Sequence, residues 1–144
     1  MKVTLSVIKA DVGSIGGHTE PSKKMMNCCD AMVVEAVNDG TLIDGIVTHT
    51  GDDIALIMSH VHGVGAENIH VFAWDCFLEA TQIAKEQCLY AAGQDLLVDA
   101  PSGNIRGAGP AVAEIEFKRD PASKIRPSEA FLVFLDLLQI FSLN

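Results

Sequence analysis

Apolar and polar residues alternate along four short segments of the chain and recur at helical spacing along two longer ones. Alternation with many β-branched residues is typical of half-buried strands, whereas apolar positions three and four residues apart are typical of amphipathic helices. The predicted strands cover residues 3–8, 42–48, 54–60 and 111–117, and the predicted helices cover residues 21–38 and 67–88. A continuous apolar run at residues 131–135 predicts one further, buried strand.

The order of the first six elements is strand, helix, strand, strand, helix, strand, which is the split βαβ arrangement of ferredoxin-like folds. The sequence therefore predicts an α/β (α+β) domain with a ferredoxin-like mixed sheet and its helices on one face. The opposite face of such a sheet needs a cover of its own. We therefore expect the domain to be part of a larger layered α-β-β-α sandwich, completed by another domain or subunit.

Two adjacent carboxylates, Asp52 and Asp53, stand between the second and third predicted strands. A Gly-Asp pair in this position favours a tight turn, so both acids are predicted at one hairpin tip. Two anions held this close repel each other unless a cation lies between them, and carboxylate oxygens suit Mg²⁺. A third acid, Asp11, follows the first predicted strand. The alternative is that an Asp-Asp pair in a turn is only solvated turn chemistry.

Bulk composition narrows the classes of function. The 144 residues fit a single domain, and a hydrophobic content of 49% is enough for a buried core. The net charge of −9 argues against a nucleic-acid partner, and no apolar run reaches the roughly 20 residues of a membrane span. The four cysteines form no Cys-x-x-Cys pair, so we interpret them as reduced thiols of a cytoplasmic protein. An acidic protein that acts on an anionic substrate needs metal ions to offset its own field.

Other polar positions are weaker candidates for a site. His18 follows a glycine-rich loop, and Tyr90 and Gln94 follow the second predicted helix. A Gln amide oxygen is an acceptable Mg²⁺ ligand, and a Tyr hydroxyl can bind phosphate. The Gly-rich segment 102–110 matches no nucleotide-binding loop, but its amides could form an anion-binding nest. His60 has no evident acidic partner and, like the histidine two residues later, is predicted at the surface or an interface.

Longer motifs around these positions are similar to those of one known family. They read KADVGS at residues 9–14, THTGDD at 48–53, LYAAGQDLL at 89–97 and SGNIRG at 102–107, with His18 between the first two. With this spacing, from Lys2 to about Leu135, the chain resembles the archaeal-type (class V) fructose-1,6-bisphosphate aldolase/phosphatases.

The resemblance implies a function and a set of site residues. These enzymes of gluconeogenesis condense dihydroxyacetone phosphate and glyceraldehyde 3-phosphate to fructose 1,6-bisphosphate and then remove the 1-phosphate, using Mg²⁺ and forming homo-oligomers. The implied Mg²⁺ ligands are Asp11, His18, Asp52, Asp53 and Gln94. The implied substrate-binding residues are His18, Tyr90, Gly103 and Asn104. Asp11 is also the implied base that activates water for phosphate release.

The chain departs from the family pattern after Leu135. Family chains continue with an aspartate that is another metal ligand and then a lysine, whereas here Asp136 comes one position early and the lysine is missing. The resemblance therefore implies an N-terminal metal- and sugar-phosphate-binding part at residues 1–135 and an aberrant or truncated apolar tail at residues 136–144. Because the family's Schiff-base lysine and catalytic tyrosine have no counterpart here, we expect no aldolase activity and low phosphatase activity from this chain.

Two other functions stay open at the level of the sequence. One is a metal-dependent phosphatase for a different sugar phosphate. The other is a non-catalytic, ferredoxin-like module that keeps the metal loops and binds a ligand. Phosphate release in the presence of Mg²⁺ separates the two enzymes from the binding module.

Overall fold

The computed structural model describes residues 2–17, 19–96 and 109–118. Its elements are β1 (Lys2–Asp11), α1 (Lys23–Asn38), β2 (Asp44–Thr50), β3 (Asp53–His60), α2 (Glu67–Glu86) and β4 (Ala111–Lys118). The first six predicted elements are confirmed in kind and order, with their bounds moved by a few residues. The predicted strand at 131–135 and the predicted tail at 136–144 lie outside the described residues.

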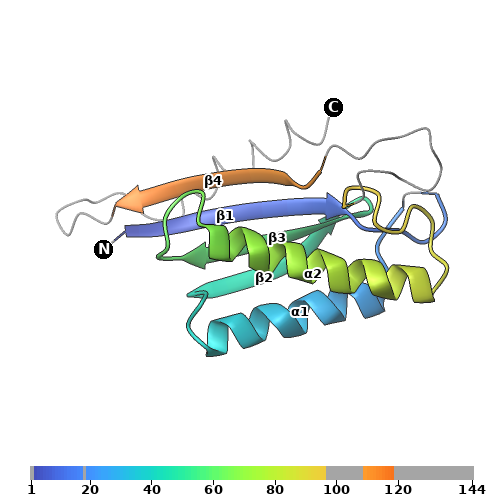
Figure 1. Ribbon diagram of the computed structural model, residues 1–144, viewed down its shortest axis with the longest axis horizontal. Helices are drawn as coiled ribbons and strands as arrows, with labels where there is room; N and C mark the ends of the chain where they lie inside the picture. The colour runs from blue at the N-terminus through green and yellow to red at the C-terminus, as the bar shows by residue number, and fades with distance from the viewer. Residues whose placement is uncertain (1, 18, 97–108, 119–144) are drawn as a thin grey trace.

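The four strands form one sheet in the order β2-β3-β1-β4, and each neighbouring pair is antiparallel. Strands that run in the same direction, β1 with β2 and β3 with β4, are therefore never neighbours. This is the ferredoxin-like arrangement that the element order predicted. Both helices lie on the same side of the sheet (Figure 1). Among the described helices, none is long and apolar enough to span a membrane.

The core lies between the sheet and the two helices. Even-numbered residues of β1 and β3 point toward the helices, because side chains alternate along a strand. The buried residues that share this layer include Ile8, Ala10, Ile54, Leu56 and Met58 from the strands, Met25, Cys29 and Val33 from α1, and Ile69, Ala73 and Phe77 from α2. Ser22 caps α1, since its Oγ accepts a hydrogen bond from the Met25 amide at 3.3 Å.

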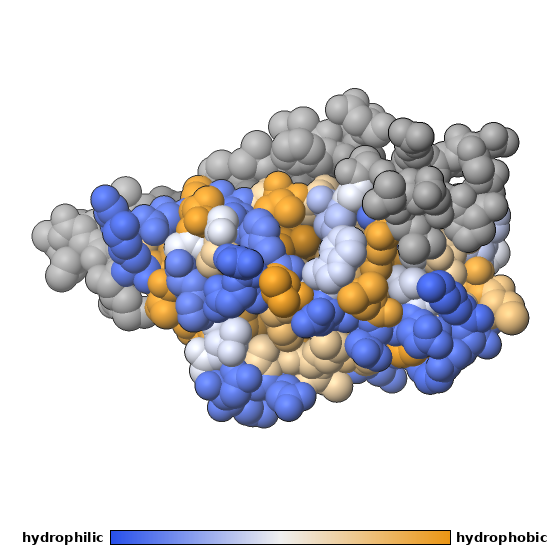
Figure 2. All heavy atoms as spheres, in the orientation of Figure 1, coloured by the Kyte–Doolittle hydropathy of each residue, from blue (hydrophilic) through white to orange (hydrophobic). Residues whose placement is uncertain are grey.

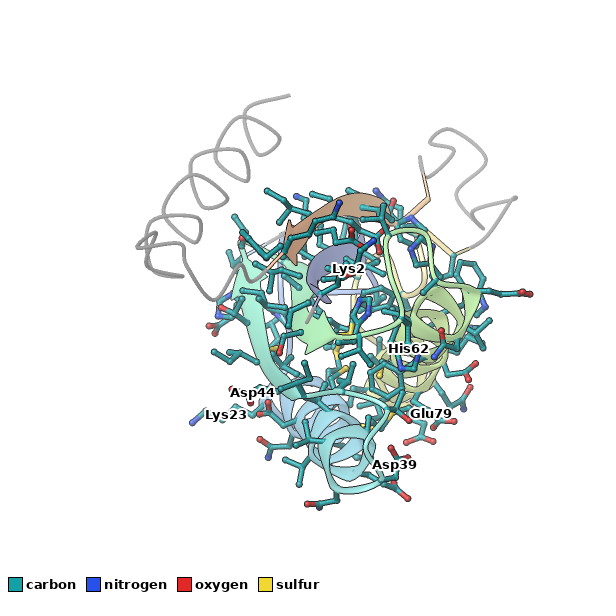
Figure 3. All side chains as sticks on the ribbon, turned by 90° about the vertical axis from the view of Figure 1, so that its left-hand side faces the viewer. Lys2, Lys23, Asp39, Asp44, His62 and Glu79 are labelled. Atoms are coloured by element: carbon teal, nitrogen blue, oxygen red, sulfur yellow. The ribbon has the colours of Figure 1, made fainter. Side chains whose placement is uncertain are left out.

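The outer surface of the helices is mostly polar. In Figure 3 the labelled side chains of Lys23, Asp39 and Glu79 lie at the periphery of the helical layer. Helix α2 also exposes Trp74 and Leu78, and Figure 2 shows apolar atoms scattered among hydrophilic ones over this side of the molecule. Single exposed apolar side chains of this kind are common on protein surfaces.

The odd-numbered residues of β1 and β3 form the second face of the sheet, to which neither described helix contributes. This face is apolar along most of its length, with Val3, Leu5 and Val7 on β1. It becomes polar at the end of the strand, where Lys9 and Asp11 follow. The larger sandwich expected from the sequence remains a prediction. Because side chains alternate along a strand, Lys9 and Asp11 at the end of β1 lie on the face opposite the helices.

Gly45 lies where β2 packs against Val33 of α1. A Cβ atom built at this position would lie 2.6 Å from Val33 Cγ1, which is closer than two carbon atoms can approach. The glycine therefore lets α1 pack directly on the edge strand that leads into the β2–β3 turn.

We expect Gly45→Ala to lower the free energy of unfolding by about 1–3 kcal/mol, because the added methyl group overpacks this contact. Val33→Ala should lower it separately by removing buried apolar atoms. In the double variant the smaller side chain on α1 makes room for the new methyl group, so the loss should be about 1 kcal/mol or more below the sum of the single losses. Urea-induced unfolding of the four proteins measures this coupling, and strictly additive losses would contradict the contact.

Candidate metal centre

The β2–β3 hairpin carries two of the acids singled out in the sequence. Thr50 pairs with Asp53, so the turn between the strands consists of Gly51 and Asp52. Gly51 has a φ of 60°, a conformation that glycine adopts without a steric penalty. Asp52 therefore lies in the turn itself, while Asp53 is the first residue of β3.

Asp11, the last residue of β1, pairs directly with Asp53 across the sheet. One carboxylate oxygen from each of Asp11, Asp52 and Asp53 lies within 4.8 Å of the others. Three hard oxygen donors at this spacing fit a small divalent cation such as Mg²⁺. The structure thus brings together three of the five ligands implied by the sequence motifs.

Burial and a neighbouring negative charge both disfavour the ionised form of the Asp11 carboxyl. Its side chain is buried, and this burial, followed by the negative charge of Asp52, raises the pKa of the Asp11 carboxyl to about 6. The Gly13 amide acts in the opposite direction, because it donates a hydrogen bond to Asp11 Oδ1 at 3.1 Å. A divalent cation among these carboxylates would favour their ionised forms and offset the repulsion between them.

Lys9 supplies a positive charge at the same place. Its Nζ lies 2.6 Å from Asp53 Oδ2, and both side chains are largely shielded from solvent, with exposed fractions of 15% and 24%. Sequence reasoning assigned Lys9 no role in the metal site. The available signal was its spacing of two residues from Asp11, which places both side chains on one face of the strand.

The segment after α2 runs along the end of β1. Tyr90 and Ser14 exchange two main-chain hydrogen bonds of 3.0 and 3.1 Å, and the Gly93 amide donates to the Val12 carbonyl at 3.1 Å. Figure 1 shows this segment, the end of β1 and the β2–β3 turn together at one end of the sheet. Tyr90 is 58% exposed there, and Gln94 is half-buried. Both predicted residues are therefore at the acidic end of the molecule.

Asp95, the next residue in this segment, contacts the main chain of Asp11, and the sequence did not predict this contact. Its Oδ2 accepts a hydrogen bond from the Asp11 amide at 2.9 Å, and its own amide donates to the Asp11 carbonyl at 3.1 Å. The residue belongs to a motif used for the family resemblance, but it was given no role of its own. His18, Gly103 and Asn104 lie outside the described residues, and their roles stay predictions.

One histidine prediction is wrong. His60 is fully buried, and its Nε2 lies 2.8 Å from Ser6 Oγ, which donates to Glu114 Oε1 at 2.7 Å. Glu114 also lies 3.0 Å from His70 Nε2 and accepts from the Gly65 amide at 2.6 Å. The sequence alone does not indicate that Glu114 is the acidic partner, because only the pairing of β1 with β4 places it beside Ser6. This network lies at the opposite end of β3 from the acidic cluster.

The fold and the donor set define an α+β protein with a candidate site for a divalent cation. Residues 2–136 match the family model for fructose-1,6-bisphosphatase. The chain therefore belongs to this family, which confirms the resemblance drawn from the motifs.

Individual relatives agree with this assignment. The chain is 50% identical over 133 residues to the fructose-1,6-bisphosphate aldolase/phosphatase of Thermus thermophilus and 52% identical over 133 residues to that of Methanocaldococcus jannaschii. It is 50% identical over 135 residues to that of Pyrobaculum neutrophilum. The alignments cover 92–93% of this chain but only 32–35% of each relative. The chain thus spans about a third of the length of the curated relatives it matches.

The raised pKa of Asp11 predicts a pH-dependent stability in the absence of metal. The folded state binds more protons than the unfolded state between the ordinary pKa of 3.8 and the folded pKa of about 6. The free energy of unfolding should therefore fall as the pH rises through this window. Asp11→Asn removes this titration while keeping an oxygen for the Gly13 amide, so the variant should gain about 2 kcal/mol on the wild type between pH 4 and pH 7.

Urea unfolding with a chelator present, at a series of pH values, measures this difference. Other groups titrate in both proteins, so the comparison isolates Asp11. A difference in stability that does not change with pH would show that Asp11 ionises normally in the folded protein.

Proposed function

We propose that this chain forms the Mg²⁺- and sugar-phosphate-binding part of a fructose-1,6-bisphosphate aldolase/phosphatase, acting on the 1-phosphate of fructose 1,6-bisphosphate. The observation that carries the proposal is the convergence of Asp11, Asp52 and Asp53 from two strands and a turn to within 4.8 Å. The family membership and the names of the relatives support the choice of substrate. The same three carboxylates would be an unfavourable arrangement in a protein that bound no cation.

Different residues of the chain would bind the metal ion and accept the proton during phosphate hydrolysis. Mg²⁺, when bound, supplies positive charge that offsets the charge of the phosphate ester. Asp11, Asp52 and Asp53 would hold this ion from the end of β1, the turn and the start of β3. Gln94 and His18 would be further ligands. Asp11 would accept the proton of the attacking water, and the hydrogen bond from Gly13 to its Oδ1 limits rotation of the carboxylate.

Other residues would bind the sugar phosphate. Tyr90 presents an exposed side chain at the same end of the sheet, where its hydroxyl would donate to a phosphate oxygen. His18, Gly103 and Asn104 complete the proposed substrate contacts. The side chain of Lys9 holds Asp53 at 2.6 Å and adds a positive charge to a site that receives an anionic substrate.

The remaining properties of the family are proposed for the whole protein to which this sequence corresponds. They are the condensation of dihydroxyacetone phosphate with glyceraldehyde 3-phosphate, a role in gluconeogenesis in the cytoplasm, and assembly into a homo-oligomer.

Calorimetric titration with Mg²⁺, followed by assay of phosphate release from fructose 1,6-bisphosphate, tests the proposed function. We expect saturable Mg²⁺ binding and slow phosphate release that stops when the metal is chelated. Asp53→Asn should weaken Mg²⁺ binding and phosphate release by about 100-fold, because it removes a ligand charge. Asp30→Asn, an equal charge change at an exposed position on α1, is the matched control and should behave like the wild type.

The outcomes separate the alternatives. Mg²⁺ binding without release from any sugar phosphate would favour the non-catalytic module, and faster release from another sugar phosphate would change the substrate. If Asp53→Asn and Asp30→Asn bound Mg²⁺ equally well, the metal site would lie elsewhere.

A further inference from the structure

Among the residues that the structure describes, the last residue of β1 pairs with a strand on one side, through Asp53 of β3. The pairing of β1 with β4 ends where Lys9 pairs with Ala111, so Asp11 extends beyond the end of β4. Main-chain groups at the end of a buried strand need other hydrogen-bond partners. Asp95 provides both partners, since its Oδ2 accepts from the Asp11 amide at 2.9 Å and its amide donates to the Asp11 carbonyl at 3.1 Å. Asp95 thus makes the two main-chain hydrogen bonds on the side of Asp11 that faces away from β3.

This contact affects how Asp11 faces Asp53. The amide and carbonyl of a strand residue point to the same side, and those of Asp11 point toward Asp95. Asp11 and Asp53 therefore form the non-hydrogen-bonded type of antiparallel pair, in which cross-strand side chains lie closest together. The hydrogen bonds to Asp95 favour this close approach of the two carboxylates.

We propose that Asp95 is a positioning residue of the metal centre, which fixes the main chain of Asp11 so that its carboxylate stays within reach of Asp52 and Asp53. The proposal deepens the proposed function and rests on it where metal binding is concerned. Asp95 also follows Gln94 directly, so the same contact sets the distance between Asp11 and another proposed ligand. The Asp95 carboxylate acts because its oxygen accepts the hydrogen bond at the right place. Its negative charge at another position would not hold the main chain of Asp11.

Two conservative variants separate position from charge. Asp95→Asn keeps an acceptor oxygen at the same distance from the main chain and removes the charge. Asp95→Glu keeps the charge and moves the acceptor by one methylene group. Asp75→Asn, at an exposed position on α2, controls for the change in net charge. Both Asp95 variants retain a polar side chain of similar size, so the comparison does not depend on a truncation that could unfold the segment.

The first measurement is hydrogen exchange of the Asp11 amide by NMR without metal. We expect the exchange rate of this amide in Asp95→Asn to stay within about threefold of the wild type. In Asp95→Glu the rate should increase about tenfold or more, because the amide loses the hydrogen bond that protects it. The second measurement is Mg²⁺ affinity by calorimetry. Affinity should fall about 10–100-fold in Asp95→Glu, the usual effect of disturbing a group that orients a metal ligand, and less than about fivefold in Asp95→Asn.

Three results would overturn the proposal. If Asp95→Asn lost as much affinity as Asp95→Glu, or more, the charge of Asp95 would matter and its position would not. If Asp95→Glu left the exchange of the Asp11 amide unchanged, the hydrogen bond would not control this strand end. If amide exchange followed the expected order while affinity stayed equal in all proteins, Asp95 would serve the fold alone. A wild type that bound no Mg²⁺ would refute the proposed function, while the exchange data would still test the contact.

Discussion

The pairing of Asp11 with Asp53 across β1 and β3 is the constraint on which the rest of the site depends. An antiparallel register places two carboxylates on adjacent strands, and the two-residue turn before β3 adds a third. Like charges opposite each other destabilise a sheet, so this register is favourable only if something else compensates for it. The hydrophobic core on the other face of the same strands provides that compensation, since Ile54 and Leu56 would leave the core if the register moved by one residue.

Residues around the three carboxylates affect both the charge of the cluster and its geometry. Lys9 neutralises part of it through Asp53, and burial keeps the pKa of Asp11 near 6. Asp95 acts on geometry, because it completes the hydrogen bonds of a strand end that β4 does not reach. A site built this way is held in place before a cation arrives, which limits the reorganisation needed for binding. The geometry of the candidate metal centre is in this sense a consequence of how the ends of the strands are held in place.

The sequence predicted the parts of this arrangement that depend on local pattern. Alternation and helical spacing identified all six described elements, and the Gly-Asp pair identified the hairpin that carries Asp52. Contacts between distant segments were not predictable in the same way. The roles of Lys9 and Asp95 and the burial of His60 follow from strand register and from the path of the chain after α2. Patterns along the chain do not show which residues of distant segments meet across a sheet.

We propose that Asp11, Asp52 and Asp53 share one divalent cation. Anomalous diffraction from crystals of the protein soaked in Mn²⁺, a substitute for Mg²⁺ with a strong anomalous signal, tests it most directly. We expect a peak about 2.0–2.6 Å from an oxygen of each of the three carboxylates. A saturated crystal with no peak at this position, or with a peak that is bound by other residues while the contact between Lys9 and Asp53 remains intact, would contradict it.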